Sequence, residues 1–357
     1  MIRPSLRRRA RGRTLSRVGL TLAAGLGAAA LAACSTTSTT DSDGDSGTTA
    51  ESAADADAFP VTIEHAFGET TIESEPQRVA TLGWVDQDHL LALDVVPVGA
   101  IEVSWGGNEQ MSTPWFDEKL EELGGEQPTR YSDADGAPVE EIAKLTPDLI
   151  LATNSGITEE EYDKLSKIAP VVAYPGDAWL TSWEDSLEMV GQAVGRSELA
   201  DEVHEETEAA LEQATEDNPQ IEGKSFIFAS LTTADTSKID FYMPGDARPD
   251  ILVDLGMVNA PIVEKLSKPG TFYGTVSAER APEMEADVFI TYAESEDDLE
   301  TFTNDPLLGQ IPGIENGHVL AATDKTEALG MSSPSPLSLP YAMEHFIPQV
   351  AAAVDGN

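Results

Sequence analysis

Aromatic rings, hydroxyl groups, an amide and an arginine stand where this sequence predicts that β-strands end. They are Trp84, Trp105, Asn154 and Tyr174 in the first half of the chain, and Thr232, Tyr242, Arg248 and Tyr292 in the second. Open α/β sheets bind ligands beyond the carboxyl ends of their strands, so these side chains are placed to share one site. Aromatic faces and hydroxyls suit a large, partly apolar ligand. Taken singly, each aromatic residue fits ordinary core packing equally well.

Two arginines are candidates for a polar contact in that site. The 357-residue chain holds 21 Lys and Arg against 64 Asp and Glu, a net charge of −43, so cations are scarce. Arg130 and Arg248 can each donate charge-assisted hydrogen bonds to an oxygen of a chelate. Solvation at the surface would explain either arginine alone. The acidic surface excludes nucleic acid as a partner, because phosphate binding needs clustered basic residues.

The sequence offers no recognisable catalytic or metal-binding motif. Ala229-Ser230-Leu231 lacks the glycines of a nucleophile elbow, and there is no His-Glu-x-x-His segment. The five histidines are scattered without the paired spacing that a zinc or manganese site needs. We therefore expect a binding protein with no enzymatic activity, no cofactor and no site for a bare metal ion. A surface hydrolase, or a sensor or adhesion module, is the alternative.

Short apolar strands alternate with helices around the candidate residues. Strands are predicted at 78–82, 96–101, 149–152, 171–174, 226–229, 239–242, 288–291 and 319–321, with helices at 86–93, 139–145 and 158–168. Val61–His65 and Glu69–Ile72 predict a hairpin around Gly68. This alternation is typical of an α/β fold with mostly parallel sheets.

A long helical tract divides the chain into two α/β lobes. It begins at Ser182, is interrupted at Gly195 and ends near Thr215, and a last helix is predicted from Leu337 to Val354. We predict an N-terminal lobe at 59–181, a connecting helix at 182–217 and a C-terminal lobe at 218–357. No cysteine is free to form a disulfide, so an apolar core must stabilise the fold.

The two predicted lobes repeat one short pattern. Glu140 is followed eight residues later by Asp148 and a buried strand, and Glu279 is followed in the same way by Asp287. Each glutamate lies in the first turn of a predicted helix, where the helix dipole favours an acid, and Ser277 can cap the second helix. By itself the pattern fits helix capping as well as it fits a function.

Cys34, the only cysteine, follows the parts of a secretory signal. Seven arginines within the first 17 residues precede an apolar run from Val18 to Ala33, which is shorter than the ~20 residues that span a bilayer. The segment Leu31-Ala32-Ala33-Cys34 resembles the bacterial lipobox, in which the signal is cut before a lipid-modified cysteine. We predict a signal peptide at 1–33, lipid on Cys34, a disordered tether at 34–58 and a position on the outer side of the cytoplasmic membrane. An uncleaved membrane anchor is the alternative.

Several segments resemble the iron–siderophore and cobalamin substrate-binding proteins of ABC importers. They are Gly68 with Thr71-Ile72, Pro76-Gln77-Arg78-Val79, the run 93–99, the run 139–150, Val276-Ser277-Ala278-Glu279 and the run 337–342. The match extends from about Val61 to the end of the chain. Asp94 stands where glycine is usual in the family, and the acidity of this chain is extreme.

The resemblance implies a clamp of two α/β lobes joined by a rigid helix, with the ligand between the lobes. The ligand would be a ferric siderophore; acidity favours a neutral or weakly charged hydroxamate over an anionic catecholate, and haem and cobalamin remain open. Matched by motif, Glu140 and Glu279 would dock onto arginines of the permease, which works with an ATPase. A monomer is expected.

Overall fold

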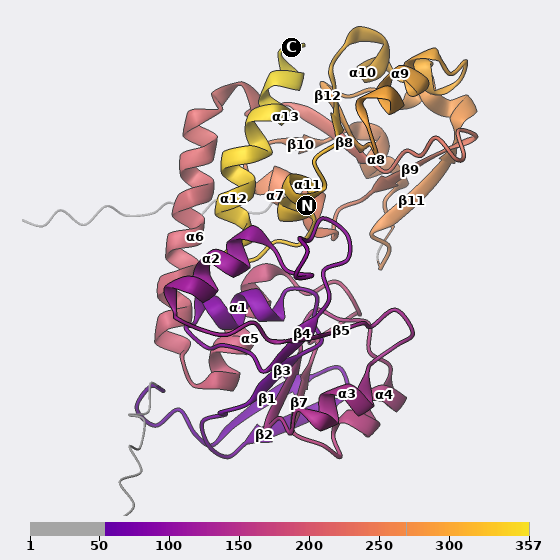
Figure 1. Ribbon diagram of the computed structural model, residues 1–357. Helices are drawn as coiled ribbons and strands as arrows, with labels where there is room; N and C mark the ends of the chain where they lie inside the picture. Colours follow the sequence, from indigo (N-terminus) through magenta and orange to yellow (C-terminus); the bar gives the residue numbers. More distant parts are fainter. Residues whose placement is uncertain (1–53, 269, 357) are drawn as a thin grey trace, which may run out of the picture. The chain divides into compact units, whose positions relative to one another are not determined.

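Residues 54–268 and 270–356 are described by the structure, a computed structural model, and all of them belong to one unit that extends from Glu51 to Asn357. The predicted signal peptide, Cys34 and most of the predicted tether lie outside the described residues. The described unit has two lobes, each built around its own sheet (Figure 1). This confirms the predicted α/β architecture.

The sheet of the N-terminal lobe is fully parallel. Its strands lie in the order β5-β4-β3-β6-β7. They are β3 (Val79–Thr81), β4 (Gly99–Ile101), β5 (Thr129–Tyr131), β6 (Leu149–Ala152) and β7 (Val171–Ala173). The chain winds from β3 outward to β5 and then returns to β6 on the other side of β3. Loops after the strands at such a reversal diverge and leave a crevice for a ligand.

Helices and a hairpin complete the N-terminal lobe. The hairpin pairs β1 (Val61–His65) with β2 (Gly68–Ile72), as predicted. The helices are α1 (Asp86–Ala92), α2 (Pro114–Glu122), α3 (Val139–Lys144) and α4 (Glu159–Leu165). The predicted capping box of α4 is present, since Thr158 Oγ1 accepts from Glu161 N and the Glu161 carboxylate accepts from Thr158 N. Sequence periodicity missed α2 and β5, and β5 has only three residues.

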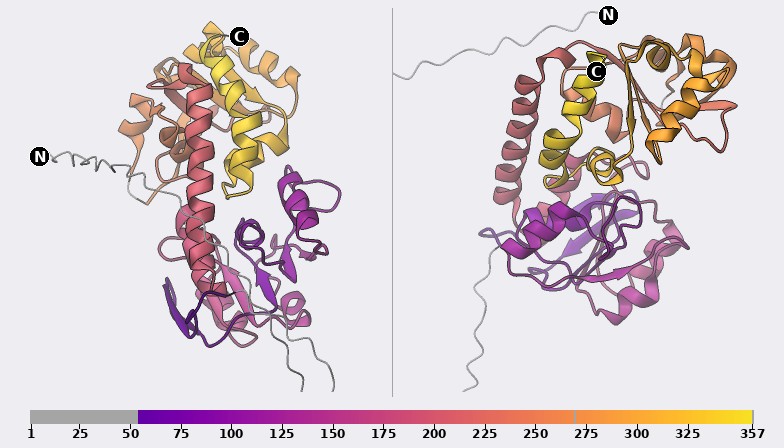
Figure 2. Two further views of the ribbon diagram at one scale, coloured as in Figure 1. Left: turned by 90° about the vertical axis from the view of Figure 1, so that its left-hand side faces the viewer. Right: turned by 45° about the horizontal axis from the view of Figure 1, so that its top comes forward.

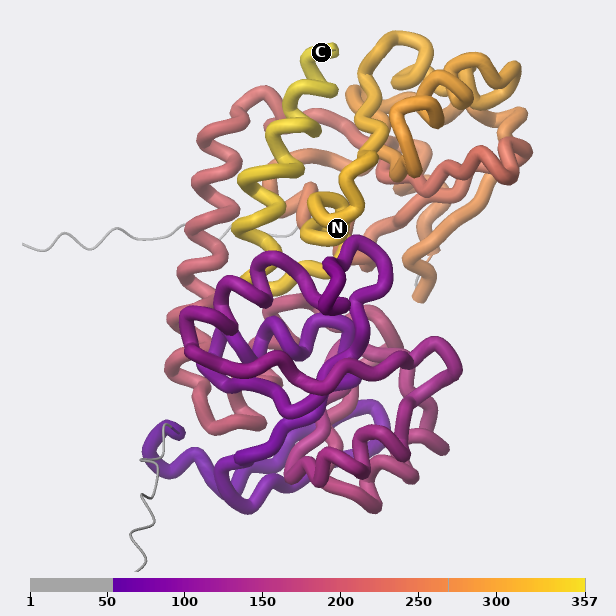
Figure 3. Tube along the Cα trace, viewed as in Figure 1, coloured from indigo at the N-terminus to yellow at the C-terminus, as the bar shows by residue number. Residues whose placement is uncertain are grey.

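Two helices join the lobes. The chain turns between α5 (Trp183–Val194) and α6 (Ser197–Asp217) at Gly195, whose φ of 70° is the left-handed conformation that glycine adopts at a helix end. Helix α6 runs beside both lobes (Figures 2 and 3). Residues 54–58, at the end of the predicted tether, lie against this turn, because Asp55 N donates to Gly195 O at 2.7 Å and Glu198 N donates to the Asp55 carboxylate at 3.1 Å.

The sheet of the C-terminal lobe is mixed. Its strands lie in the order β11-β9-β8-β12-β13, and β10 pairs with β8. The strands are β8 (Ser225–Ala229), β9 (Lys238–Tyr242), β10 (Val258–Asn259), β11 (Tyr273–Ser277), β12 (Val288–Tyr292) and β13 (Val319–Ala322). Strands β10 and β12 pair in parallel with β8, and β13 pairs in parallel with β12, whereas β9 pairs antiparallel with β8 and β11 pairs antiparallel with β9. The sequence did not predict β10 or the edge strand β11.

The helices of the C-terminal lobe are short. They are α7 (Ala247–Asp254), α8 (Pro261–Leu266), α9 (Glu296–Asn304), α10 (Pro312–Asn316), α11 (Lys325–Ser332), α12 (Ser338–His345) and α13 (Ile347–Val354), with 3-10 turns η1 (Pro219–Ile221), η2 (Ala278–Glu283) and η3 (Leu308–Gln310). The single last helix predicted from the sequence is two helices, because Pro348 at the start of α13 has no N–H to continue α12. No helix in the described ranges is long and apolar enough to cross a membrane.

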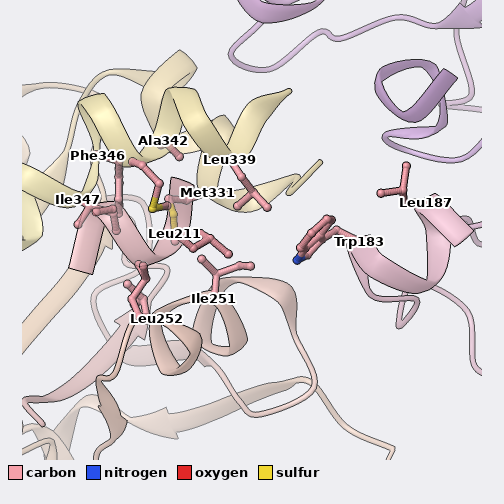
Figure 4. Close-up of a cluster of buried hydrophobic side chains, with 14 of the residues drawn as sticks. Trp183, Leu187, Leu211, Ile251, Leu252, Met331, Leu339, Ala342, Phe346 and Ile347 are labelled. Carbon is pink, nitrogen blue, oxygen red and sulfur yellow. The ribbon is translucent and has the colours of Figure 1, made fainter. Parts of the chain in front are cut away.

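One apolar core extends through the joint between the lobes. Figure 4 shows Leu211 of α6 among residues of α7, α11, α12 and α13, with Trp183 of α5 facing this group and Leu187 of α5 beyond Trp183. The same cluster includes strand residues of both sheets, such as Leu149 and Phe228. Burying each large apolar side chain contributes roughly 1.5–3 kcal/mol. The joint is therefore a packed core that opposes large movements of one lobe against the other.

Candidate functional site

A cavity of about 430 Å³ lies where the ends of several strands meet between the lobes. The N-terminal lobe contributes Trp84, which follows β3, and Trp105, which follows β4. The C-terminal lobe contributes the rest of the lining: Ser230, Leu231, Thr232, Thr233, Tyr242, Arg248, Tyr292, Ala293, Glu294, Asp298, Lys325 and Ser332. The cavity thus occupies the place that the strand-end rule predicts.

Aromatic rings form much of the cavity wall. Trp84 and Trp105 remain 38% and 37% exposed, although tryptophan is usually well covered. Trp105 stands edge-on to Tyr292 with ring centroids 5.4 Å apart, and Tyr242 stands edge-on to Tyr292 at 6.4 Å. Exposed faces of this kind can cover a large, partly apolar ligand.

Arg248 lines the cavity and is held by three side-chain hydrogen bonds. It lies in the first turn of α7, and its guanidinium carbon is 4.1 Å from the centre of the Tyr242 ring. Nη1 donates to both oxygens of Asp246 at 2.9 and 2.8 Å, and Nε donates to Tyr292 Oη at 2.8 Å. For Nη2 the described residues provide no hydrogen-bond partner, so its two N–H groups are free for a ligand. The other bonds fix the guanidinium plane before a ligand arrives.

The surroundings of Arg248 hold it charged and hold Tyr242 neutral. Burial lowers the pKa of Arg248, but Tyr292, Asp246 and Tyr242 outweigh this and raise it above its usual range. Burial raises the pKa of Tyr242. Its hydroxyl therefore stays protonated at neutral pH and can donate a hydrogen bond.

The remaining charges of the cavity wall are paired or negative. Lys325 Nζ is 2.6 Å from Glu294 Oε2. Asp298 Oδ2 accepts from Glu294 N at 2.8 Å. Since Arg248 is paired with Asp246 and Lys325 with Glu294, the wall has no positive charge without a carboxylate beside it.

Six of the nine predicted ligand residues line this cavity: Trp84, Trp105, Thr232, Tyr242, Arg248 and Tyr292. Arg130, Asn154 and Tyr174 do not. The Tyr174 hydroxyl donates to Ile157 O at 3.1 Å, and the backbone oxygen of Asn154 accepts from Trp84 N at 2.9 Å. Arg130 is half-buried and bonds to Ile101 O and Ser112 Oγ.

A second hollow adjoins the cavity on the N-terminal lobe. It measures about 340 Å³ and is lined by Trp84, Ile101, Glu102, Val103, Ser104, Trp105, Asp133 and Trp179. Trp179 is 45% exposed and stands edge-on to Trp84 at 6.4 Å. The sequence analysis did not select Trp179, although its place after β7 is a usable signal. It also missed Asp298, Lys325 and Ser332. Asp298 and Lys325 lie in the first turns of α9 and α11, helices that follow β12 and β13 and that the sequence did not predict, and Ser332 ends α11.

Glu140 and Glu279 are both exposed and both lie in the first turn of a short helix. The hydroxyl of Ser277 accepts from Glu279 N at 3.4 Å, so the predicted cap is present. Neither glutamate lines the cavity. Within 54–268 and 270–356, no three His, Cys, Asp or Glu side chains are grouped as metal ligands would be.

Comparisons with known proteins agree on one family. A family model described as periplasmic binding protein matches residues 79–326. The probable siderophore-binding lipoprotein YfiY of Bacillus subtilis is 27% identical over 275 residues, which cover 74% of this chain and 80% of that protein. The ferric enterobactin-binding periplasmic protein FepB of Escherichia coli is 26% identical over 286 residues, which cover 77% and 87%. The crystal structure of PiaA from Streptococcus pneumoniae in complex with ferrichrome has a TM-score of 0.77 and 38% identity, covering 83% of this chain and 99% of PiaA.

Proposed function

Because the chain belongs to the periplasmic binding protein family, we propose that it is the extracytoplasmic substrate-binding component of an ABC importer. It captures a ferric siderophore between its lobes and delivers the loaded chelate to the permease. The observation that carries this proposal is the aromatic cavity lined by Arg248, whose Nε and Nη1 are hydrogen-bonded while Nη2 is left for a ligand. A ferric chelate offers both an apolar periphery and oxygen acceptors around the iron, which this wall complements.

The charge of the cavity favours a neutral or weakly charged hydroxamate chelate. A trianionic catecholate would need positive charge that is not already neutralised, whereas both cations of the wall have a carboxylate beside them. Asp298 and the strongly acidic chain add repulsion for a polyanion. Ferrichrome, the chelate bound in the PiaA structure, is of the favoured class.

Titration of the purified protein against a panel of ligands tests the proposal. Quenching of tryptophan fluorescence reports binding, because Trp84 and Trp105 line the cavity. The panel holds ferrichrome, ferrioxamine B, ferric enterobactin, haem, cobalamin and free ferric ion. We expect tight binding of a ferric hydroxamate and none of free ferric ion. Binding of no chelate, or of free ferric ion alone, would show that the proposal is wrong. Binding of haem or cobalamin alone would show that the protein imports that ligand and not a siderophore.

Glu140 and Glu279 are proposed to dock onto the permease. Both are exposed, one on each lobe, and neither lines the cavity. A matched pair of acids suits a partner that presents basic residues in a two-fold arrangement. The ATPase of the importer then acts on the permease, so the binding protein itself performs no chemical step. It is also proposed to hold no cofactor and to work as a monomer.

Lipid on Cys34 is proposed to hold the protein at the outer side of the cytoplasmic membrane. The sequence before Cys34 has the parts of a cleaved lipoprotein signal, and YfiY bears the name of a lipoprotein. A single lipid chain anchors only weakly, and anionic headgroups would repel so acidic a protein. More than one acyl chain on the modified cysteine would supply the attachment that the protein surface cannot.

A further inference from the structure

A loop of the N-terminal lobe, residues 102–112, reaches the cavity wall of the C-terminal lobe. Near its tip, Trp105 stands against Tyr292. The next residue, Gly106, accepts a hydrogen bond from Thr326 Oγ1 at 2.8 Å. Gly106 has a φ of 74°, and a Cβ there would lie 2.5 Å from the backbone oxygen of Lys325, so only glycine fits this approach. The tip of the loop therefore joins the two lobes beside the cavity.

The loop is held in shape by its own hydrogen bonds. Val103 N donates to Met111 O at 2.9 Å, and Asn108 N donates to Ser112 O at 2.9 Å. Asn108 Oδ1 in turn accepts from Ser112 N at 3.2 Å. These bonds bring the beginning and the end of the loop together. A contact that fixes both ends of the loop 102–112 therefore also fixes the position of its tip at Trp105.

Arg130 makes the bonds that hold both ends. From β5, its Nη1 donates to the backbone oxygen of Ile101, just before the loop, at 3.1 Å. Its Nη2 donates to Ser112 Oγ, at the end of the loop, at 2.9 Å. The guanidinium carbon lies 4.7 Å from the centre of the Phe116 ring, which supports its plane. A lysine ammonium lacks the planar fork needed to reach both acceptors at once.

Asp88 of α1 attracts Arg130 electrostatically and contacts the C-terminal lobe. Asp88 Oδ2 accepts from Trp115 Nε1 at 2.8 Å and from Ser335 Oγ at 2.9 Å. Burial raises the pKa of Asp88, and the positive charge of Arg130 partly offsets this rise. Arg130 is thus attracted to a carboxylate that is itself tied to the other lobe.

We propose that Arg130 is a positioning residue for ligand binding. It holds the loop 102–112 so that Trp105 closes the cavity wall against Tyr292. Tyr292 in turn accepts from Arg248 Nε. Displacement of Trp105 would therefore expose Tyr292 and Arg248, the pair that contacts the ligand, to solvent. The ordering of the loop by Arg130 follows from these contacts, and only its consequence for affinity rests on the proposed function.

Hydrogen exchange of the intact exported protein without ligand tests the ordering of the loop. In Arg130→Met, the amides of Val103 and Ser112 should exchange at least about tenfold faster than in the wild type, because the loop ends are released. The core amide of Ile150 in β6 serves as the reference for global stability. Arg196→Met is the matched control, because Arg196 Nη1 also donates to a backbone oxygen, that of Leu93, but at the turn between α5 and α6.

The exchange rates decide the first half of the proposal. Loop amides that accelerate in Arg130→Met, with Ile150 unchanged and Arg196→Met like the wild type, support it. If the loop amides accelerate only as much as Ile150, Arg130 serves general stability and the proposal is wrong. Unchanged loop amides overturn it as well.

Binding of ferrichrome tests the second half through a double-mutant cycle. Arg130→Met should weaken binding about tenfold, and Arg130→Lys should recover part of the loss. In a Trp105→Ala background, Arg130→Met should have no further effect, because Arg130 acts through Trp105. Losses that add in the double variant would contradict this. If the wild type binds no ferrichrome or other chelate, the proposed function fails, while the exchange rates still decide the role of Arg130.

Discussion

Replacing Arg248 by methionine should affect stability and ligand binding by separable amounts. The side chains of Arg248 and Asp246 are only 12% and 8% exposed and lie 2.8 Å apart. Removing one partner of a buried ion pair costs about 3–5 kcal/mol, because the other charge stays buried without compensation. Loss of one charge-assisted hydrogen bond to the chelate should cost a further ~1.5–3 kcal/mol of binding free energy, which weakens ferrichrome binding roughly 10- to 150-fold.

A second substitution separates the two effects. Asp246→Asn removes the buried charge but keeps an oxygen that can accept from residue 248 N and cap α7, as Asp246 does. Arg248→Met/Asp246→Asn should therefore regain most of the lost stability and none of the lost affinity. Urea unfolding followed by circular dichroism measures the stability. Ferrichrome titration without urea, at a temperature at which all variants are folded, measures the affinity.

Two results would refute the reasoning on Arg248. If the double variant binds ferrichrome as tightly as the wild type, the free Nη2 does not meet the ligand. If Arg248→Met unfolds at the same urea concentration as the wild type, Asp246 is not stabilised by the pair. Arg248→Lys provides the control for charge alone, since an ammonium cannot bond Asp246, Tyr292 and a ligand in the same plane.

Three further predictions concern other parts of the molecule. Burial raises the pKa of Asp86 from 3.8 to about 6, so folding takes up a proton at pH values between these two. The wild type should therefore gain stability relative to Asp86→Asn as the pH falls from 7 to 4, by at most ~3 kcal/mol. Urea unfolding at several pH values measures this difference, and a difference that stayed constant with pH would contradict the prediction. Cys34→Ala should release the protein from the membrane fraction, whereas retention there would indicate an uncleaved anchor. Changing Glu140 and Glu279 together to alanine should leave chelate affinity intact but reduce uptake more than either single change, and weaker chelate binding with normal uptake at saturating ligand would place both glutamates in the ligand site instead.

Local sequence was sufficient for the features that depend on neighbouring residues. The turn at Gly195 follows from the freedom of glycine at positive φ, and the capping box at Thr158 from side chains three residues apart. The strand-end rule placed Trp84 and Tyr292 at the cavity, because each follows or ends a strand that is parallel to its neighbours, and the carboxyl ends of parallel strands meet at one edge of a sheet.

Only the tertiary structure decided which way the polar side chains near the ends of the strands point. Arg130 and Arg248 look alike in the sequence, yet Arg130 bonds to the ends of a loop and Arg248 lines the cavity, because their acceptors Ile101 O and Tyr292 Oη lie 29 and 44 residues away along the chain. Lys325 joins the wall from a helix that begins more than 70 residues after Arg248. A polar side chain turns toward the partner that satisfies its hydrogen bonds, and for these residues that choice depends on contacts between segments distant in sequence, which local pattern does not encode.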